Sequence, residues 1–474
     1  MVNIPKPYTC DFTGDELQML GDLSVQCDLV LMSVYSLHKY HAEVLTQYFK
    51  KIRPDRPVIW GGPHCINSPE ISLKYADGVC YSEGDIAVPQ FIRLFEAGDP
   101  SYLQTPNMAF QTRGEVTINP LIPLVDDLDS LPFSDYSFEN EWVLDKSLLP
   151  LTPELYLKYC SPHPFKEATI FHLSSRGCPH RCAYCNNIRY LRMYPHLKIR
   201  RQSVGRLIAE LTHMIHLLPN ARYLSISDDD FFIRPESEIE EFVSQYNRKI
   251  GITCSFEISA VTLTSKKISH LLNLENPVFI QIGVQSGSQN VLNNVFDRSI
   301  SILKIKDAIN KILPYIKAGK IKLLCDFIID NPYETKSDII ETYKFIARLP
   351  KKVFVNLYLL SFFPGSPLYD RAMNDKLIFK EDQFMTRSYQ EREIRYQFNY
   401  ETLLLLVWES IHFTRRMPYW VIMLPASKPI RFLMGFIPRP VMAWAIRTIP
   451  AKLNRTIRFV IGVKNRKKIT SRSQ

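Results

Sequence analysis

The chain has 474 residues, enough for two or three domains, and its 46% hydrophobic and 22% charged residues are ordinary for a globular protein. Ten cysteines are too few for a disulfide-stapled scaffold, and we find neither a signal-peptide pattern nor an apolar run of about 18 residues, so we expect a soluble or peripheral protein of a reducing cytosol. The net charge is +10, but residues 411–474 hold fourteen Lys and Arg and no acidic residue, which leaves −4 for the other 410 residues.

The amino-terminal region, which we assign as a domain over residues 1–110, alternates apolar segments with helices. The second apolar segment closes in a turn made by Gly61 and Gly62. Three strands alternating with helices predict the second half of a doubly wound, Rossmann-like α/β sheet. The strands are expected at 27–36, 57–64 and 78–85, and the helices at 37–51 and 88–95.

Residues 111–165 are assigned as a linker to the next domain. Its segment 122–133 is rich in Pro and Asp, as linkers often are, and much of 134–165 is expected to be irregular.

A short loop with three cysteines follows an apolar, β-branched segment at 168–173 that predicts a buried strand. Cys178, Cys182 and Cys185 follow the spacing Cys-x-x-x-Cys-x-x-Cys, and thiolates at this spacing can converge on one soft metal centre such as an iron–sulfur cluster. A structural zinc site usually needs four protein ligands, and a disulfide would leave one thiol over, so both explain the loop less well than a cluster does. The loop stands at the carboxyl end of a strand, where α/β barrels place active sites.

Strand-like and helix-like segments continue to alternate after the loop. Six β/α units over residues 166–375 predict a parallel, partly closed barrel of the (β/α)6 type. The later strands are expected at 223–227, 252–258, 277–284, 321–329 and 353–360, with helices at 207–218, 304–316 and 336–347.

The cysteine loop closely resembles the signature of the radical S-adenosylmethionine (radical SAM) enzymes, with Tyr184 at the aromatic position of that signature. The resemblance implies that Cys178, Cys182 and Cys185 hold a 4Fe-4S cluster whose open iron binds S-adenosylmethionine. It further implies that the cluster passes one electron to S-adenosylmethionine, giving methionine and a 5′-deoxyadenosyl radical.

Four later segments resemble motifs of the same family in the same order, at 228–230, 282–288, 327–335 and 361–369. Asp330 and Tyr333 stand where the family usually has glycine. The resemblance implies contacts of the protein with S-adenosylmethionine from these strand ends. The residues concerned are Tyr184, Asp228 and Asp229 (for the methionine amino group), Ser259 (for the carboxylate), Gln285 (for the ribose) and Leu360.

The amino-terminal domain resembles the cobalamin-binding domain of a large radical SAM subfamily, in a truncated form. Three readings remain open: cobalamin bound without a histidine, a remnant domain that binds none, or a chain start that omits part of the sequence. His38 and His41 lack the context of a cobalt ligand, and we expect them on a helix surface. If cobalamin binds, the contacts implied are Ser33, Gly61, Gly62, Glu83 and Gly84.

Residues 376–474 form a basic region that six prolines divide into short helices. Within 452–464 the apolar residues share one helical face and the basic residues lie opposite, while 464–470 is expected to be disordered. A basic helical cap on the barrel, contact with an anionic membrane and binding of RNA all remain open.

These observations together predict a cytoplasmic radical SAM enzyme that methylates or otherwise modifies an unactivated carbon of a small-molecule or lipid-like substrate. An electron donor such as a flavodoxin or ferredoxin is implied. Two alternatives remain: an RNA-modifying radical SAM enzyme, and a cluster-bearing binding or electron-transfer protein that makes no radical.

Overall fold

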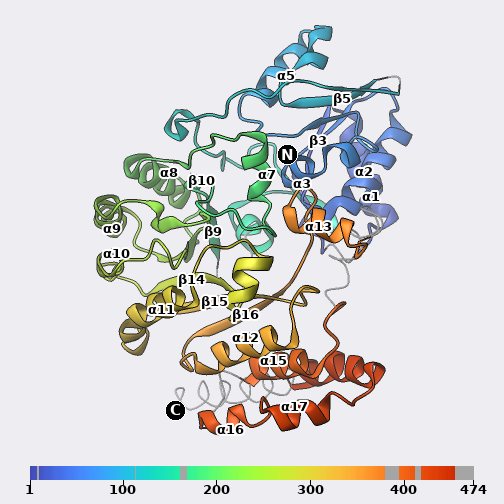
Figure 1. Cartoon of the computed structure of the whole chain (residues 1–474). Helices are drawn as coiled ribbons and strands as arrows, with labels where there is room; N and C mark the ends of the chain where they lie inside the picture. The colour runs from blue at the N-terminus through green and yellow to red at the C-terminus, as the bar shows by residue number, and fades with distance from the viewer. Residues whose placement is uncertain (8–9, 113, 161–167, 379–393, 412–417, 454–474) are drawn as a thin grey trace, which may run out of the picture. The chain divides into compact units, whose positions relative to one another are not determined.

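The computed structural model describes all residues except 8–9, 113, 161–167, 379–393, 412–417 and 454–474 (Figure 1). The chain forms two compact units, one of residues 1–224 with 361–391 and one of residues 225–360 with 392–474. The division falls inside strand β12 (Tyr223–Ile226), and both units are built from strands and helices. The α/β fold class is therefore confirmed.

The first unit contains a five-stranded sheet in the order β2-β3-β4-β5-β6. β2, β3 and β4 run parallel, as the sequence predicts, but β5 and β6 are antiparallel and were not predicted. The doubly wound pattern therefore holds for three strands only. The bounds are β2 (Val30–Ser33), β3 (Val58–Gly61), β4 (Gly78–Cys80), β5 (Met108–Thr112) and β6 (Glu115–Ile118), with α2 (Lys39–Ile52), α3 (Pro63–Asn67), α4 (Pro69–Ser72), α5 (Ala87–Glu96) and the 3₁₀ helices Ser36–His38 and Pro100–Gln104.

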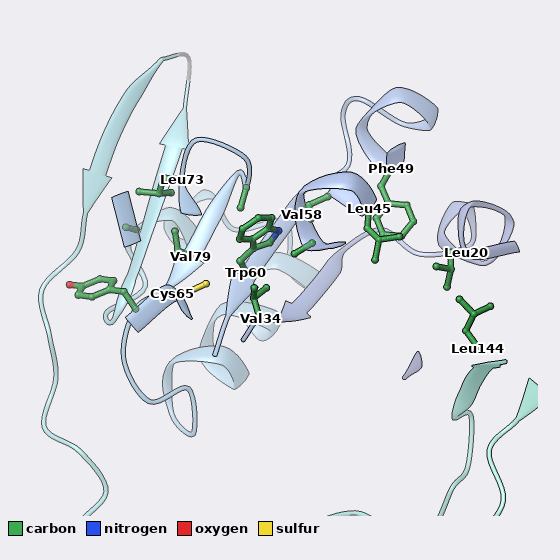
Figure 2. Packing of buried hydrophobic residues seen from close by; sticks show 14 residues of the cluster. Leu20, Val34, Leu45, Phe49, Val58, Trp60, Cys65, Leu73, Val79 and Leu144 are labelled. Atoms are coloured by element: carbon green, nitrogen blue, oxygen red, sulfur yellow. The ribbon is translucent and has the colours of Figure 1, made fainter. Parts of the chain in front are cut away.

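Helix α2 packs on this sheet through side chains at helical spacing. Ala42, Leu45 and Phe49 are buried on one face of the helix. They lie in a cluster with Trp60 of β3, which is fully buried (Figure 2). The indole Nε1 of Trp60 donates a hydrogen bond to Thr46 Oγ1 at 2.9 Å, so this large apolar ring is buried with its polar atom satisfied.

A second sheet in the same unit has the order β1-β7-β8. Because two of its strands lie between residues 134 and 165, the expectation that this segment is mostly irregular is wrong. Helix α1 (Gly14–Val25) begins with a capping box between Thr13 and Glu16, a start signal present in the sequence. The other bounds are β1 (Val2–Asn3), β7 (Trp142–Asp145), β8 (Ser147–Pro150), α6 (Pro153–Leu155), the 3₁₀ helix Leu128–Ser130 and the π-helix Tyr156–Cys160.

The six strands predicted for the barrel are present and follow one another in chain order. In the first unit, β9 lies beside the first half of β12; in the second unit, the sheet continues from β12 through β13, β14 and β15 to β16. The neighbouring pairs from β13 to β16 are parallel. Their bounds are β9 (Thr169–His172), β13 (Thr253–Ile258), β14 (Val278–Gln285), β15 (Ile321–Ile329) and β16 (Phe354–Leu359).

The helices of the second unit pack against one face of these strands. Phe256 of β13 contacts Phe242 of α9, and Phe327 of β15 contacts Phe345 of α12. Because side chains alternate along a strand, the residues directly before and after Phe256 and Phe327 point to the opposite, inner face of the sheet. The helix bounds are α9 (Glu236–Lys249), α10 (Ser265–Leu271), α11 (Ile302–Lys317), α12 (Lys336–Arg348), the 3₁₀ helix Phe231–Ile233 and the π-helix Val291–Val295; in the first unit they are α7 (Asn187–Met193), α8 (Val204–Leu217) and α13 (Pro367–Asn374).

The carboxyl-terminal segment contributes short helices to the second unit (Figure 1). α15 (Tyr400–Ile411) packs on α12, and the Tyr343 hydroxyl donates to the carbonyl of Ile422 at 2.7 Å. α16 (Tyr419–Met423), α17 (Lys428–Met434) and a helix at 439–453 are separated by prolines, as predicted. The predictions for 464–470 and for most of 452–464 fall outside the described residues. Among the described helices, none is both long and apolar enough to cross a bilayer.

Candidate active site

The cysteine loop is closed at its base by a two-stranded antiparallel ribbon. β10 (Ser175–Arg176) pairs with β11 (Arg200–Arg201), so residues 177–199 form the loop between them. Gly177 directly after β10 has a φ of +105°, which favours glycine and turns the chain into the loop. Inside the loop, the Ala183 carbonyl accepts a hydrogen bond from the Leu368 amide at 2.9 Å, which ties it to the start of α13.

The three thiols of this loop fit a cluster. None of the three forms a disulfide with another described cysteine; Cys182 is buried, and Cys178 and Cys185 are partly exposed. Among the described residues no three His, Cys, Asp or Glu side chains are close enough to share a single metal ion. A cluster does not require that, because each of its thiolates binds a different iron.

Two arginines of the ribbon bind the turn after β4. The Glu83 carboxylate accepts from Arg200 Nη2 at 2.6 Å and from Arg176 Nη1 at 2.7 Å. Arg176 also bridges Asp85, at 2.7 and 3.1 Å. Burial would raise the pKa of Asp85, but its hydrogen bonds and charge interaction with Arg176 outweigh this and hold that pKa below its usual value. The cysteine loop is therefore anchored to the predicted cobalamin-type domain by charge-assisted hydrogen bonds.

The linker lies against the same arginine-rich region. Arg200 Nη1 donates to the Val125 carbonyl at 2.9 Å, and the Tyr194 hydroxyl donates to the Ile122 carbonyl at 3.2 Å. The Tyr194 hydroxyl also lies 2.7 Å from Ser82 Oγ, directly before Glu83. The segment 122–133 thus contacts the residues that support the cysteine loop.

The acidic end of β12 places its three carboxylates differently. Asp228 is buried, Asp229 is exposed, and Asp230 is buried. Asp230 Oδ1 accepts from the Ser259 amide at 3.1 Å, and both carboxylate oxygens of Asp230 accept from Thr262 Oγ1. Burial raises the pKa of Asp230 to about 6, although these hydrogen bonds lower it. Asp230 therefore organises the loop after β13.

Ser259 itself has a local role as well, since its hydroxyl accepts from the Val261 amide at 3.2 Å. Leu360, the other predicted strand-end contact, donates its amide to the Ile329 carbonyl at 2.9 Å and is buried. Both residues stand at the carboxyl ends of strands, as the sequence predicts. Their contacts with S-adenosylmethionine remain predictions.

Gln285 ends β14 in a left-handed conformation, with a φ of +69°. Its side chain folds back over Gly283, where a β-carbon would lie 2.4 Å from Gln285 Nε2. The Gly283 carbonyl accepts from Arg298 Nη2 at 3.0 Å. This close packing holds the Gln285 amide at the strand end.

Asp330 keeps a backbone conformation that suits glycine, with a φ of +60°. Its buried carboxylate accepts the backbone amides of three consecutive residues: Arg395 at 2.7 Å, and Tyr396 and Gln397 at 2.9 Å. Burial raises the pKa of Asp330, while these amides lower it. Asp330 thus replaces the usual glycine of the motif and gains a function of its own, binding the chain before α15.

The remaining predicted cobalamin contacts lie at the carboxyl edge of the parallel strands. Gly62 has a φ of +88°, and a β-carbon there would lie 2.9 Å from Ser33 Oγ, so Gly62 permits close approach of β2 and β3. Gly84 packs on Val88, where a β-carbon would lie 2.9 Å from a methyl group. Gly61 ends β3, directly beside Ser33 in register.

The expectation that His41 lies on a helix surface is wrong. His41 is buried, and its Nε2 lies 2.8 Å from the Cys10 carbonyl. His38 is partly buried, with its ring 5.8 Å from that of His41. Burial lowers the pKa of His38, and the neighbouring His41 lowers it further.

Sequence reasoning missed two carboxylates on the inner face of the barrel strands. Glu257 of β13 and Asp326 of β15 both stand inside strands whose opposite face is apolar. The sequence alone could have pointed to these two acids, because a charged residue is unusual in the middle of a predicted buried strand. Burial raises the pKa of Glu257 to about 7 and that of Asp326 to about 6.

Comparison with known proteins agrees with this geometry. Residues 173–346 match the family model described as the radical SAM superfamily. The chain is 23% identical over 357 residues to an uncharacterised methyltransferase of Pyrococcus horikoshii, covering 74% of this chain and 70% of that protein. It is 20% identical over 368 residues to the anaerobic magnesium-protoporphyrin IX monomethyl ester cyclase of Cereibacter sphaeroides, and 19% identical over 360 residues to the cobalamin-dependent radical SAM methyltransferase TokK of Streptomyces tokunonensis.

The last two alignments cover 76% and 74% of this chain, but the chain spans only about half the length of those relatives, 55% and 49%. Among solved structures, the radical S-adenosylmethionine methyltransferase TsrM of Kitasatospora setae has a similar fold. The TM-score is 0.60 at 12% sequence identity, with 76% of this chain and 68% of that chain covered.

The family match and the three-cysteine loop identify residues 173–346 as a radical SAM domain. The similar proteins include one named as a cobalamin-dependent radical SAM methyltransferase, TokK. A radical SAM domain implies a 4Fe-4S cluster and S-adenosylmethionine, and the three cysteine side chains of the loop are the donor set that such a cluster needs.

Proposed function

We propose that this protein is a cobalamin-dependent radical SAM enzyme that transfers a methyl group to an unactivated carbon of a small-molecule or lipid-like substrate. The observation that carries the proposal is the pair of ion-paired arginines, Arg176 and Arg200, which join the base of the cysteine loop to Glu83 of the amino-terminal domain. An anchored contact of this kind suits an enzyme in which a cluster and a second cofactor must act at a set separation.

Each candidate residue has a defined part in this proposal. Cys178, Cys182 and Cys185 hold the cluster, which together with S-adenosylmethionine supplies radical chemistry when bound. Asp228 and Asp229 accept the methionine amino group, and Gln285 binds the ribose. Tyr184, Ser259 and Leu360 complete the proposed contacts.

Cobalamin is proposed to bind at the edge where β2 and β3 end. Ser33, Gly61 and Gly62 offer a hydroxyl and an unobstructed backbone there. Glu83 already accepts hydrogen bonds from two arginines, so we propose that Glu83 and Gly84 shape this edge through the turn after β4.

Peripheral membrane contact is proposed for the carboxyl-terminal helices. Large apolar side chains there are strongly exposed, while residues 411–474 contain only basic charges. Exposed aromatic rings beside basic residues are typical of segments that lie in the headgroup region of an anionic bilayer. The most exposed rings are Trp420 at 71%, Phe432 at 69%, Phe436 at 71% and Trp444 at 60%.

The test is anaerobic reconstitution of the full chain with iron, sulfide and hydroxocobalamin, followed by gel filtration and a visible spectrum for retained corrin. The loaded protein is then reduced in the presence of S-adenosylmethionine, with a flavodoxin or a chemical donor. Chromatography measures 5′-deoxyadenosine and S-adenosylhomocysteine, the products expected from cleavage and from methyl transfer.

The matched controls are Cys182→Ala in the loop and Cys27→Ala, an exposed cysteine in the amino-terminal region. We expect both products from the wild type and from Cys27→Ala, and neither from Cys182→Ala. An intact cluster without either product would instead support a cluster-bearing electron-transfer protein. Formation of 5′-deoxyadenosine with neither retained corrin nor S-adenosylhomocysteine would overturn the cobalamin part and leave a radical enzyme that does another reaction.

A further inference from the structure

The inner face of the strands in the second unit carries a polar layer above an aromatic floor. Phe279 of β14 and Phe354 of β16 contact each other there, with ring centroids 5.9 Å apart. Alternate residues of a strand point to the same face. Farther along these strands and their neighbours, the side chains on the face of Phe279 and Phe354 are polar. These side chains are Glu257, Gln281, Asp326, Asn356 and Tyr358.

The strand register brings these residues side by side. Glu257 is the direct partner of Gln281 on the neighbouring strand, and Asp326 is the direct partner of Asn356. Gln281 Nε2 reaches diagonally to Asp326 Oδ2 and donates a hydrogen bond of 2.6 Å. Gln281 therefore stands between the two carboxylates and binds one of them.

The two carboxylates lack the partners that buried acids usually have. Asp326 is 7% exposed, yet its Oδ1 accepts no hydrogen bond from any described residue. Among the described residues, no hydrogen bond or ion pair reaches Glu257 either, and its charged neighbours are Asp326, Asp229 and Asp228, all negative. Elsewhere in the chain, comparable acids meet a cation: Glu401 meets Arg431 at 3.0 Å, and Glu83 meets Arg200.

A buried acid beside a partly buried one, with no cation between them, is costly in the free protein. Removing a carboxylate from water without a cation or full hydrogen bonding costs several kcal/mol unless the group takes up a proton. A positively charged nitrogen placed between Glu257 and Asp326 would satisfy both the empty acceptor atom and the excess negative charge. The amides of Gln281 and Asn356 and the hydroxyl of Tyr358 add neutral polar atoms around it.

We propose that Glu257 and Asp326 form a binding site for an ammonium or amidinium group of the substrate, held inside the barrel over the Phe279–Phe354 floor. The inference rests on the proposed function and narrows its substrate class to molecules with a cationic nitrogen beside an apolar or aromatic part. A metal ion suits the site less well, because among the described residues no third His, Cys, Asp or Glu completes such a site.

The test uses benzylammonium as the probe and benzyl alcohol as its neutral counterpart. S-adenosylmethionine is present at the same concentration in every sample, so that its own amino group affects all of them equally. Thermal unfolding of the reconstituted full chain is followed with each probe at constant ionic strength. The variants are Glu257→Gln and Asp326→Asn, and the matched control is Glu240→Gln, an exposed acid on α9.

We expect benzylammonium, but not benzyl alcohol, to raise the unfolding temperature of the wild type and of Glu240→Gln. Each of the two inner-face variants should weaken benzylammonium binding at least tenfold. Equal effects of the two probes, or unchanged binding in both inner-face variants, would overturn the proposal.

A second measurement needs only the wild type, in case a variant does not fold. Burial raises the pKa of Glu257 to about 7 and that of Asp326 to about 6, so a cation that binds between them at pH 6.5 should displace protons. Calorimetry at that pH in two buffers of different ionisation enthalpy should report proton release. Binding without proton release would count against the site. Cleavage of S-adenosylmethionine in a protein that shows no cation preference would refute this inference alone, whereas a cation preference without cleavage would refute the proposed function alone.

Discussion

Arg176 and Arg200 are direct partners across the β10–β11 ribbon, and both guanidinium groups bind the same carboxylate, that of Glu83. Like charges facing each other on neighbouring strands repel, so the ribbon that closes the cysteine loop needs an acid supplied from outside it. Glu83 lies 93 residues before Arg176 and 117 residues before Arg200 in the chain. The base of the cysteine loop therefore depends on the fold of the amino-terminal domain.

Replacing Glu83 with Gln should destabilise the protein by on the order of 3 kcal/mol, because the Arg200 side chain, 4% exposed, would keep its charge without its carboxylate partner. Urea unfolding measures this cost, and iron content after reconstitution measures the effect on the loop. Asp370→Asn is the control, since the Arg192–Asp370 pair is exposed and such pairs contribute less than about 1 kcal/mol. Equal costs for the two variants would contradict the role given to Glu83.

Each of Cys178→Ala, Cys182→Ala and Cys185→Ala should abolish retention of the cluster, because the loop offers three thiolates and the cluster needs all three. Iron and sulfide per chain, measured after anaerobic desalting, should fall close to zero in each variant. Cys10→Ala, which removes an exposed thiol outside the loop, should retain the wild-type content. Retention of iron by any loop variant would show that another residue supplies a ligand.

Asp330 should tolerate glycine better than alanine. Both substitutions remove the acceptor of three backbone amides, but only alanine also pays the left-handed conformational cost at a φ of +60°, about 1 kcal/mol. We expect Asp330→Gly to lose roughly 2–4 kcal/mol of stability and Asp330→Ala about 1 kcal/mol more. Equilibrium unfolding in urea gives the order, and the reverse order would contradict the backbone conformation.

The stability of the protein should fall as the pH rises through the titration of Glu257. Its pKa is about 7 in the folded protein, raised first by burial and then by Asp326, against an ordinary value of 4.5. As the pH rises from about 4 to about 7, the unfolded chain therefore loses this proton before the folded protein does, which favours unfolding. Asp326, raised to about 6, acts in the same direction.

Glu257→Gln should remove part of this fall and be more stable than the wild type by on the order of 2–3 kcal/mol at pH 8, with a much smaller gain near pH 4. The free energy of unfolding, measured across that range for Glu257→Gln, Glu240→Gln and the wild type, checks the sign. A wild type that grows more stable between pH 4 and pH 7 relative to Glu257→Gln would show that a cationic group already compensates the pair.

Serine at both Trp420 and Phe436 should weaken binding to anionic vesicles at least tenfold, since each exposed ring contributes roughly 1.5–3 kcal/mol when it is removed from water. Co-sedimentation with phosphatidylserine-containing vesicles measures the binding, which salt should also weaken. Leu303→Ser is the control, because Leu303 is 76% exposed but lies on α11. Binding to RNA with no binding to vesicles would favour the nucleic-acid alternative for this region.

The barrel strands were readable from the sequence because each is a run of apolar and β-branched residues bounded by polar turns. β15 has the predicted bounds, Ile321–Ile329, and β9, β12, β13, β14 and β16 differ from their predictions by at most one residue at either end. The cluster ligands were equally readable, since three thiols within eight residues need no distant partner to define their chemistry.

Short or partly polar strands escaped this reasoning. β5 and β6 alternate little and end in exposed residues, and β7 and β8 are four residues each, so their pairing rather than their composition makes them strands. Likewise, the basic composition of the carboxyl-terminal region showed its charge but not which aromatic rings remain exposed.

The sequence by itself determined the strand order of the barrel, the cysteine loop and the glycine turn after β3, because each depends on residues that are neighbours along the chain. Only the tertiary structure decided that Glu83 neutralises two arginines, that Asp330 binds the amides of residues 395–397, and that Glu257 and Asp326 share a strand face with no cationic partner among the described residues. The charge state and partners of a carboxylate depend on what surrounds it, and packing sets those surroundings from segments about 65 to 120 residues apart.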